Sequence, residues 1–250
     1  MPLHPEDSQN ISLNKYISSS GYCSRRAADK IIKAGRVTIN GKTAQSGNRV
    51  GIDDKVLVDG NPIVHKEPYI YLAFNKPVGI TCTAEKSVKD NIIDFINYPR
   101  RIFHVGRLDK DSEGLILLTN DGEIVNKVLR AGNKHEKEYI VRVNKKITDD
   151  FIKAMRSGIP VLDTITNKCF VKKESNHEFR IILTQGLNRQ IRRMCEYLGY
   201  KVKALQRIRI MHIKLDTLPV GKWRHLNKAE VTKLKNSTEH SKKTTLQKQK

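Results

Sequence analysis

The stretch GNPIVHKEP at residues 60 to 68 interrupts every regular pattern in this chain of 250 residues. Glycine, two prolines and charged residues in so short a run are typical of a connection between folded parts. We therefore expect a small module at residues 11 to 59, a linker at 60 to 68 and a larger domain at 69 to 234. Residues 235 to 250 are rich in Lys, Ser, Thr and Gln with a single Leu, and are predicted to form a disordered basic tail.

Short-range patterns in the module at 11 to 59 predict two helices followed by a hairpin. A first helix in LNKYISSSG ends at Gly21, Ser24 is placed to cap a second helix, and Gly35 fits the left-handed position after its last turn. Asn40 and Gly41 then lie between two short strands, and Asn-Gly is the strongest short-range indication of a hairpin.

The second helix of this module carries a basic stripe. Arg26, Lys30 and Lys33 fall on one side at helical spacing, and the alanines and isoleucines of the segment face the other side. The motif L-x-K-x-I, followed by S-R-R-A-A-D-x-x-I-x-x-G-x-V-x-x-N-G, resembles the S4 RNA-binding domain, in which such a helix and the following hairpin grip RNA phosphates. The resemblance implies RNA contacts from Arg25, Arg26, Lys30, Lys33, Arg36, Asn40 and Lys42.

Positive charge is concentrated in three parts of the chain. There are 47 Lys and Arg against 26 Asp and Glu, a formal charge of +21. Residues 12 to 49 carry eight basic and one acidic residue (+7), residues 187 to 224 carry ten and two (+8), and residues 233 to 250 carry six and one (+5). Concentrated positive charge binds a phosphate backbone by releasing counterions, so we expect a nucleic-acid partner. A basic surface that is merely solvated is the alternative.

The larger domain alternates short apolar strands with helices. Its strands include YIYLAF, GLILLT, EYIVRV and FRIILT. Thr148 and Asn188 are placed to cap two of its helices, and the second of these stops at Gly199. The pattern predicts an α+β domain.

Other classes of protein and site find no support in the sequence. No apolar run reaches the roughly 18 residues that a membrane span needs, and the N-terminal residues carry no secretory or organellar address, so we expect a cytoplasmic protein without a membrane partner. Cys23, Cys82, Cys169 and Cys195 form no C-x-x-C pair and have no histidine at metal-ligand spacing, which argues against zinc and disulfides. Glycine motifs for nucleotide cofactors are absent, so no cofactor is expected.

The candidate site is HVGRLDKDSEGLILLTNDGE at residues 104 to 123, for which two interpretations compete. Asp109, Asp111 and Glu113 before a glycine imitate the first half of a calcium loop, but its twelfth position would be Asn120 instead of a bidentate glutamate. In the second interpretation Asp109 is a lone reactive carboxylate, kept ionised by Arg107 and by an arginine of RQIRR. Ordinary glycosidases need two carboxyl groups. An enzyme that cuts a glycosidic bond and rejoins the same two fragments needs no water and no second displacement by solvent.

Four motifs in order carry a resemblance to a known family. NKPVGI at 75 to 80, Gly106 to Asp109, KEYIV at 137 to 141 and GLNRQIRRM at 186 to 194 resemble the RsuA-type family of bacterial RNA pseudouridine synthases. That family contains enzymes of types A, B, E and F, and the chain is most similar to the type F branch, which acts on the large ribosomal RNA. The resemblance, which covers about residues 11 to 234, implies an S4-like module followed by a catalytic domain built on a central, mostly antiparallel sheet.

The resemblance also implies the roles of the site residues. Asp109 would attack C1′ of the ribose or remove a proton from C2′ while the uracil is detached, turned and reattached through C5. Tyr139 would stack on the flipped uracil and Ile191 would pack against it. Arg192 would pair with Asp109, a role that Arg189 or Arg193 could take instead, and Arg107 would enter the space that the base leaves.

The expected partners follow from the same resemblance. Large-subunit ribosomal RNA is the first substrate, a transfer RNA anticodon is a further one, and Arg189 and Arg193 contribute to RNA binding. We expect a monomer that needs no metal and no cofactor. A non-catalytic S4-type RNA-binding or ribosome-assembly factor is the main alternative, and a nuclease or methyltransferase would need a carboxylate cluster or a glycine-rich loop that the sequence lacks.

Overall fold

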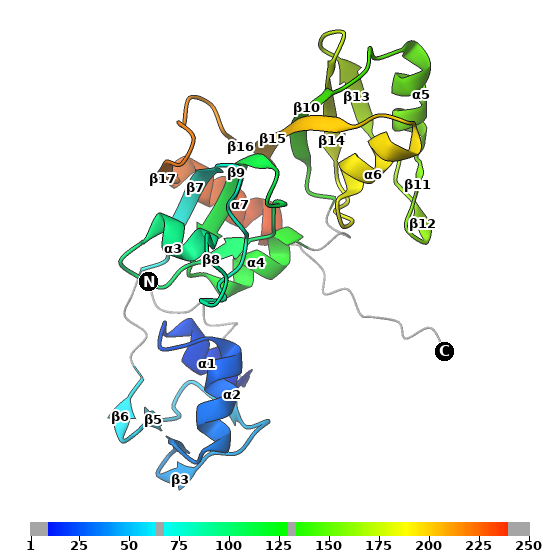
Figure 1. Ribbon diagram of the computed structural model, residues 1–250. Coiled ribbons are helices and arrows are strands. Elements are labelled where there is room, and N and C mark those ends of the chain that lie inside the picture. The colour runs from blue at the N-terminus through cyan, green and yellow to red at the C-terminus, as the bar shows by residue number, and fades with distance from the viewer. Residues whose placement is uncertain (1–9, 64–67, 130–133, 240–250) are drawn as a thin grey trace. The chain divides into compact units, whose positions relative to one another are not determined.

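The computed structural model describes residues 10–63, 68–129 and 134–239 (Figure 1). The chain divides into two compact units after Tyr69, close to the end of the interruption at residues 60 to 68. Each unit has a hydrophobic core of its own.

The first unit begins with two helices, α1 (Leu13–Ser19) and α2 (Arg25–Lys33). The hydroxyl of Ser24 accepts a hydrogen bond from the backbone N–H of Ala27 at 3.1 Å, which confirms the predicted cap. Gly35 follows α2 with φ of +69°, the left-handed conformation expected there. Ala28 and Ile32 of α2 are buried against Leu13 and Ile17 of α1, so the apolar side of the second helix faces the core.

Short strands complete the first unit. Asn40 and Gly41 have φ of +50° and +80°, the two left-handed residues of a tight hairpin turn. A second two-stranded pairing ties the start of the unit to its middle. The strands are β1 (Ile11–Ser12) paired with β4 (Arg49–Val50), and β3 (Lys42–Thr43), β2 (Val37–Ile39), β5 (Val56–Val58) and β6 (Asn61–Pro62) in that order in one sheet.

The position of β6 shortens the linker. Asn61 and Pro62 lie in the stretch expected to be linker, but they pair with Val58 and Leu57. Proline is tolerated there because β6 is an edge strand, which needs no N–H donor on its outer side. The connection therefore begins after residue 62; residues 64–67 lie outside the described part of the chain.

The second unit is built on a nine-stranded sheet, and its path β13-β14-β10-β15-β9-β7-β17 is antiparallel except where β15 meets β9. This confirms the expected mostly antiparallel sheet. Figure 1 shows the strands in two groups, with β15 running from one group to the other. The strands are β7 (Tyr71–Lys76), β8 (Phe103–Val105), β9 (Glu113–Thr119), β10 (Lys137–Val143), β13 (Phe170–Lys173), β14 (Glu178–Leu183), β15 (Val202–Ile210), β16 (Ile213–Lys214) and β17 (Trp223–His225), with the separate hairpin β11 (Pro160–Val161) and β12 (Thr164–Ile165).

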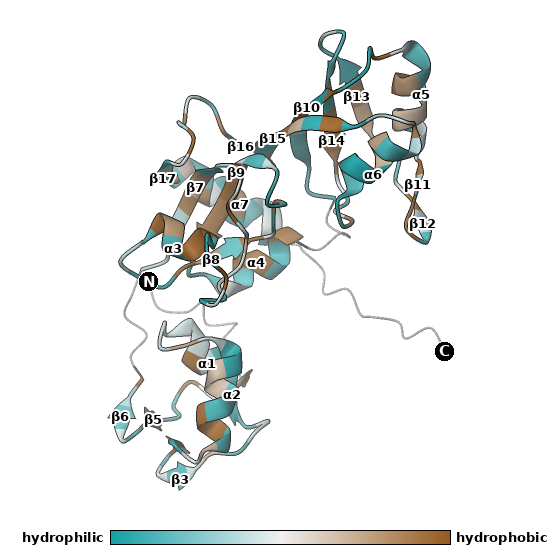
Figure 2. Cartoon of the chain, viewed as in Figure 1, coloured by the Kyte–Doolittle hydropathy of each residue, from teal (hydrophilic) through white to brown (hydrophobic). Residues whose placement is uncertain are grey.

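Helices cover both faces of this sheet because the central strands are apolar on both sides. Alternate residues of β7 and β9 enter two different cores, which gives the continuous apolar colour of β9 in Figure 2. Residues of α3, α5 and α6 pack in the first core, and residues of α4 and α7 pack in the second. The helices are α3 (Ile92–Ile96), α4 (Gly122–Leu129), α5 (Asp149–Ser157), α6 (Gln190–Tyr197) and α7 (Lys228–Glu239).

Two helix boundaries differ from the prediction. Thr148 caps α5 as expected, but α6 begins after Arg189, a residue with φ of +49° whose side chain makes no cap. Asn188 does not cap α6, because its side-chain and backbone oxygens accept hydrogen bonds from Arg193. The last helix continues to Glu239 and so includes the first five residues of the tail expected from 235, and residues 240–250 lie outside the described part of the chain.

Candidate active site

Asp109 lies in the loop between β8 and β9, at an open pocket. The backbone N–H of Leu108 donates to the Cys82 thiol at 3.4 Å, and the Asp109 carbonyl accepts from Ser112 N at 3.1 Å, so the loop is held on both sides of the carboxylate. The Asp109 side chain is 33% exposed. The pocket, of about 440 Å³, is lined by Val78, Gly79, Asp109, Lys110, Asp111 and Arg189.

Two arginines approach this carboxylate: Arg192 of α6, and Arg189, which directly precedes the helix. Arg192 Nε lies 4.0 Å from Asp109 Oδ2, and Arg189 Nη1 lies 3.8 Å from the same oxygen. Arg192 is almost completely buried, and its Nε has no hydrogen-bond partner among the described residues. The Asp109 carboxylate therefore lies within ion-pair distance of two guanidinium groups, one buried and one partly exposed.

Asp111 and Ser112 are site residues that the sequence reasoning missed. Arg192 Nη2 donates to the Asp111 carbonyl at 2.8 Å and to Ser112 Oγ at 3.1 Å, and Arg189 binds both Asp111 carboxylate oxygens at 3.1 and 3.3 Å. Burial works against ionisation of Asp111, but the hydrogen bond from Arg189 and the charge of Arg192 hold the pKa of Asp111 below its usual value. Asp111 and Ser112 therefore make the shorter contacts with the two arginines, and Asp109 lies 3.8 and 4.0 Å from them.

The expected apolar residues Tyr139 and Ile191 are buried and are not among the residues that line the pocket. Tyr139 in β10 is 9% exposed and Ile191 in α6 is 5% exposed, and both belong to the core that also contains Leu108, the neighbour of Asp109. The expected aromatic and aliphatic residues are therefore brought into one core beside the acidic loop. Arg107 is exposed on the same loop.

Lys76 supports the wall of the pocket. Its side chain is completely buried at the end of β7, and Nζ donates to the carbonyls of Pro77 and Ile80, both at 2.8 Å. Burial lowers the pKa of Lys76. Gly79 N in turn donates to the Lys110 carbonyl at 2.8 Å, so this turn is tied to the loop that carries Asp109.

The basic residues expected to bind RNA differ in how far they are already engaged. Arg36 donates two hydrogen bonds to Asp59, and the Asn40 amide bonds to Asp54 and to the backbone of Lys55. Arg193 is held by the oxygens of Asn188. The remaining members of the set in the first unit are exposed: Arg25, Arg26, Lys30, Lys33 and Lys42.

The calcium interpretation does not fit this geometry. Its loop would run from Asp109 to Asn120, but residues from Glu113 onward form the buried strand β9. Residues 10–63, 68–129 and 134–239 contain no group of three or more His, Cys, Asp or Glu side chains placed to hold a metal ion. In the same ranges, no helix has the length and apolar character of a membrane span.

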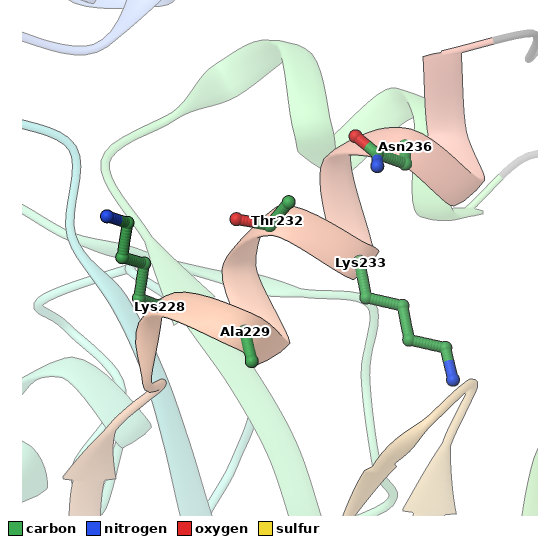
Figure 3. A pocket seen from close by; sticks show the side chains of 5 residues that line it. All are labelled: Lys228, Ala229, Thr232, Lys233 and Asn236. Atoms are coloured by element: carbon green, nitrogen blue, oxygen red, sulfur yellow. The ribbon is translucent and has the colours of Figure 1, made fainter.

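A second hollow, of about 560 Å³, lies along α7 and is lined by Lys228, Ala229, Thr232, Lys233 and Asn236 (Figure 3). All five residues come from one helix. They include no carboxylate and no aromatic ring that could act on a base. The pocket at Asp109 therefore remains the candidate active site.

Comparison with known proteins agrees with the division into two units. Residues 12–56 match the S4 domain family, and residues 70–197 match the RNA pseudouridylate synthase family. A solved structure described as a pseudouridylate synthase superimposes with a TM-score of 0.66 at 28% identity, covering 90% of this chain and 99% of the other.

Curated relatives cover most of the chain. The dual-specificity RNA pseudouridine synthase RluF of Salmonella typhi is 57% identical over 89% of this chain and 78% of its own length. The protein of the same name from Shigella flexneri is 55% identical over 93% of this chain and 81% of its own length. The ribosomal large subunit pseudouridine synthase B of Bacillus subtilis is 33% identical over 92% of this chain and 98% of its own length.

Proposed function

The chain belongs to the RNA pseudouridylate synthase family and is an RNA pseudouridine synthase, and we propose that it isomerises a specific uridine of large-subunit ribosomal RNA. A uridine in a transfer RNA anticodon is the proposed second substrate, which the words "dual-specificity" in the relatives' names support. We propose that the protein acts as a monomer in the cytoplasm.

Asp109 is the proposed reactive group. The observation that carries this assignment is the partly exposed carboxylate at the pocket, which faces the unsatisfied Nε of Arg192 at 4.0 Å. An ionised carboxylate can attack C1′ or remove the proton from C2′, and both routes break the C1′–N1 bond. Arg192 orients the carboxylate through its positive charge, and Arg189 adds its charge from the solvent side.

The apolar residues are proposed to hold the base during its rearrangement. Tyr139 stacks on the flipped uracil, an interaction worth about 1–3 kcal/mol for a base on an aromatic ring. Ile191 packs against the other part of the ring, and both side chains are fixed by the core around them. The exposed Arg107 takes the place of the base in the RNA stem, which offsets part of the unstacking cost of a few kcal/mol.

The first unit is proposed to bind RNA phosphates. Arg25, Arg26, Lys30 and Lys33 of α2 and Lys42 of the hairpin are exposed, which supports this role. Arg36 and Asn40 are the weaker members of the set because their polar groups are already bonded within the unit. Arg189 and Arg193 provide the corresponding positive charge beside the active site.

Replacement of Asp109 tests the proposal. Asp109→Asn should abolish pseudouridine formation while RNA affinity stays within about twofold, because the exposed basic residues are unchanged. Asp163→Asn, on the exposed turn of the β11–β12 hairpin, is the matched control and should keep full activity. Mapping of pseudouridines in ribosomal and transfer RNA, with and without this chain, identifies the substrates. Activity in Asp109→Asn equal to that of the unmodified chain would refute the assignment, and the absence of any lost pseudouridine would refute the substrates.

A further inference from the structure

Four residues form a transverse row across the centre of the sheet in the second unit. Lys76 of β7 pairs with Gly114 of β9, Gly114 pairs with Arg207 of β15, and Arg207 pairs with Tyr139 of β10. Cross-strand partners share one face of a sheet. The face is that of the core with Tyr139 and Ile191, because the residues two positions before Lys76 and Arg207, which are Phe74 and Leu205, also belong to that core.

Arg207 is the unexplained member of this row. It is 3% exposed, and its Nε donates to the Leu115 carbonyl at 2.6 Å. Its Nη2 is buried and has no hydrogen-bond partner within the described residues. An unsatisfied buried donor on a charged group destabilises the folded chain, so its retention points to a function.

Gly114 lets Arg207 occupy this place. A Cβ on Gly114 would lie 2.3 Å from the Arg207 carbonyl oxygen, and Gly114 has φ of +105°. The absence of a side chain therefore allows β9 and β15 to pair closely. Asp109 lies in the loop that leads into β9, so this contact places Arg207 beside the start of the strand that follows the loop.

The charges in this region do not cancel. Burial, and after it the charge of Arg207, lowers the pKa of Lys137 on β10. Burial also lowers the pKa of Lys76, on which Asp109, Asp111 and Arg207 all act. Asp109 and Asp111 already face Arg189 and Arg192, so within the described residues neither carboxylate is left to neutralise Arg207.

We propose that Arg207 stabilises the negative charge of the uracil while the base is detached from the ribose. When the C1′–N1 bond breaks, its electron pair leaves with N1, and the charge spreads over N1, O2 and O4. The charge is neutralised when C5 bonds to C1′, as the bond between C1′ and Asp109 breaks on the first route or Asp109 returns the proton to C2′ on the second. C5 then loses its proton and N1 gains one. Both routes open to Asp109 produce this anion, so the inference rests on the proposed function but on neither route. Arg207 acts through space as a preorganised charge and does not transfer a proton.

The leaving ability of the base provides the test. Fluorine at C5 stabilises the uracil anion, so a 5-fluorouridine substrate depends less on a protein charge than uridine does. In single-turnover reactions with a substrate RNA, Arg207→Met should slow the loss of uridine at least about tenfold. The factor by which it slows the loss of 5-fluorouridine should be several-fold smaller. Arg207→Lys keeps the charge, so its ratio of the uridine rate to the 5-fluorouridine rate should be close to that of the unmodified chain.

The comparison of two bases within each variant is insensitive to misfolding, because a smaller folded fraction lowers both rates equally. Arg209→Met is the matched control, since Arg209 lies on the same strand but binds Glu136 and Glu138, and its rate ratio should equal that of the unmodified chain. An Arg207→Met enzyme that slows both bases by the same factor would overturn the inference. An unmodified chain that converts no uridine would instead overturn the proposed function.

Discussion

Gly114→Ala should weaken the pairing of β9 with β15, which connects the two groups of strands. The new Cβ would lie 2.3 Å from the carbonyl oxygen of Arg207 and 2.7 Å from its backbone nitrogen, and neither atom can turn away as a side chain can. The positive φ of Gly114 adds about 1–2 kcal/mol for any residue with a Cβ. Overpacking against the backbone adds about 1–3 kcal/mol, so the free energy of unfolding should fall by about 2–5 kcal/mol.

Two further glycines separate these contributions. Gly79 has φ of +93° but nothing within 4 Å of its Cβ position, so Gly79→Ala reports the backbone strain alone. Gly122, in α4, has an ordinary φ and would place its Cβ 3.8 Å from the Phe103 ring, so Gly122→Ala should be neutral or stabilising by up to about 1 kcal/mol. Urea unfolding of the full chain measures all three.

The thermal midpoint offers a second reading of Gly114→Ala. A unit of this size loses about 2–4 °C per kcal/mol, so the expected fall is about 4–20 °C. If Gly114→Ala costs no more than Gly79→Ala, the close approach of β9 and β15 is not a constraint, and the reasoning from the Cβ distance is wrong.

Two other predictions follow from charges. A triple variant in which Met replaces Arg25, Arg26 and Lys33 should bind RNA more weakly. Its slope of log affinity against log salt should be flatter by about 0.7–0.9 per lost phosphate contact, and an unchanged slope would mean that this side of α2 does not face RNA. Burial opposes ionisation of Glu138, but hydrogen bonds from arginines of β14 and β15 hold its pKa below the usual value. Its stabilising contribution is therefore complete above the pKa of the unfolded state and is lost as pH falls through the pKa of the folded state. Between pH 7 and 3, the thermal midpoint of Glu138→Gln should depend less on pH than that of the unmodified chain. Parallel curves of midpoint against pH for the two proteins would contradict this.

Local sequence patterns predicted local structure well. Ser24, Gly35 and the Asn40-Gly41 pair act through atoms within a few residues, so the chain near them is sufficient to fix the turn or cap. Asn188 shows where this fails. It is a good capping residue by type, but the long side chain of Arg193, five positions later, reaches its oxygens.

The candidate site was only partly predictable because its contacts join distant segments. The motifs identified Asp109, and the structure brings Arg189 and Arg192 to its carboxylate. Asp111 and Ser112 were missed as partners of Arg192, which lies 81 and 80 positions further along the chain. The row from Lys76 to Tyr139 depends on sheet register, which a hydrophobic pattern does not specify for strands that are buried on both faces.

The bond from Arg207 to the Leu115 carbonyl spans 92 positions of the chain, so it also sets when the site can form during synthesis. β7, β8 and β9 can pair as soon as they leave the ribosome, since their partners are close in sequence. The loop with Asp109 makes its contacts with α6 and β15 only later, because the entropy of closing the long segment between them is lost before these contacts stabilise the fold. A nascent chain that stops before β15 therefore carries the proposed reactive carboxylate without the residues that surround it in the folded unit, and the site can be complete only after β15 has been made.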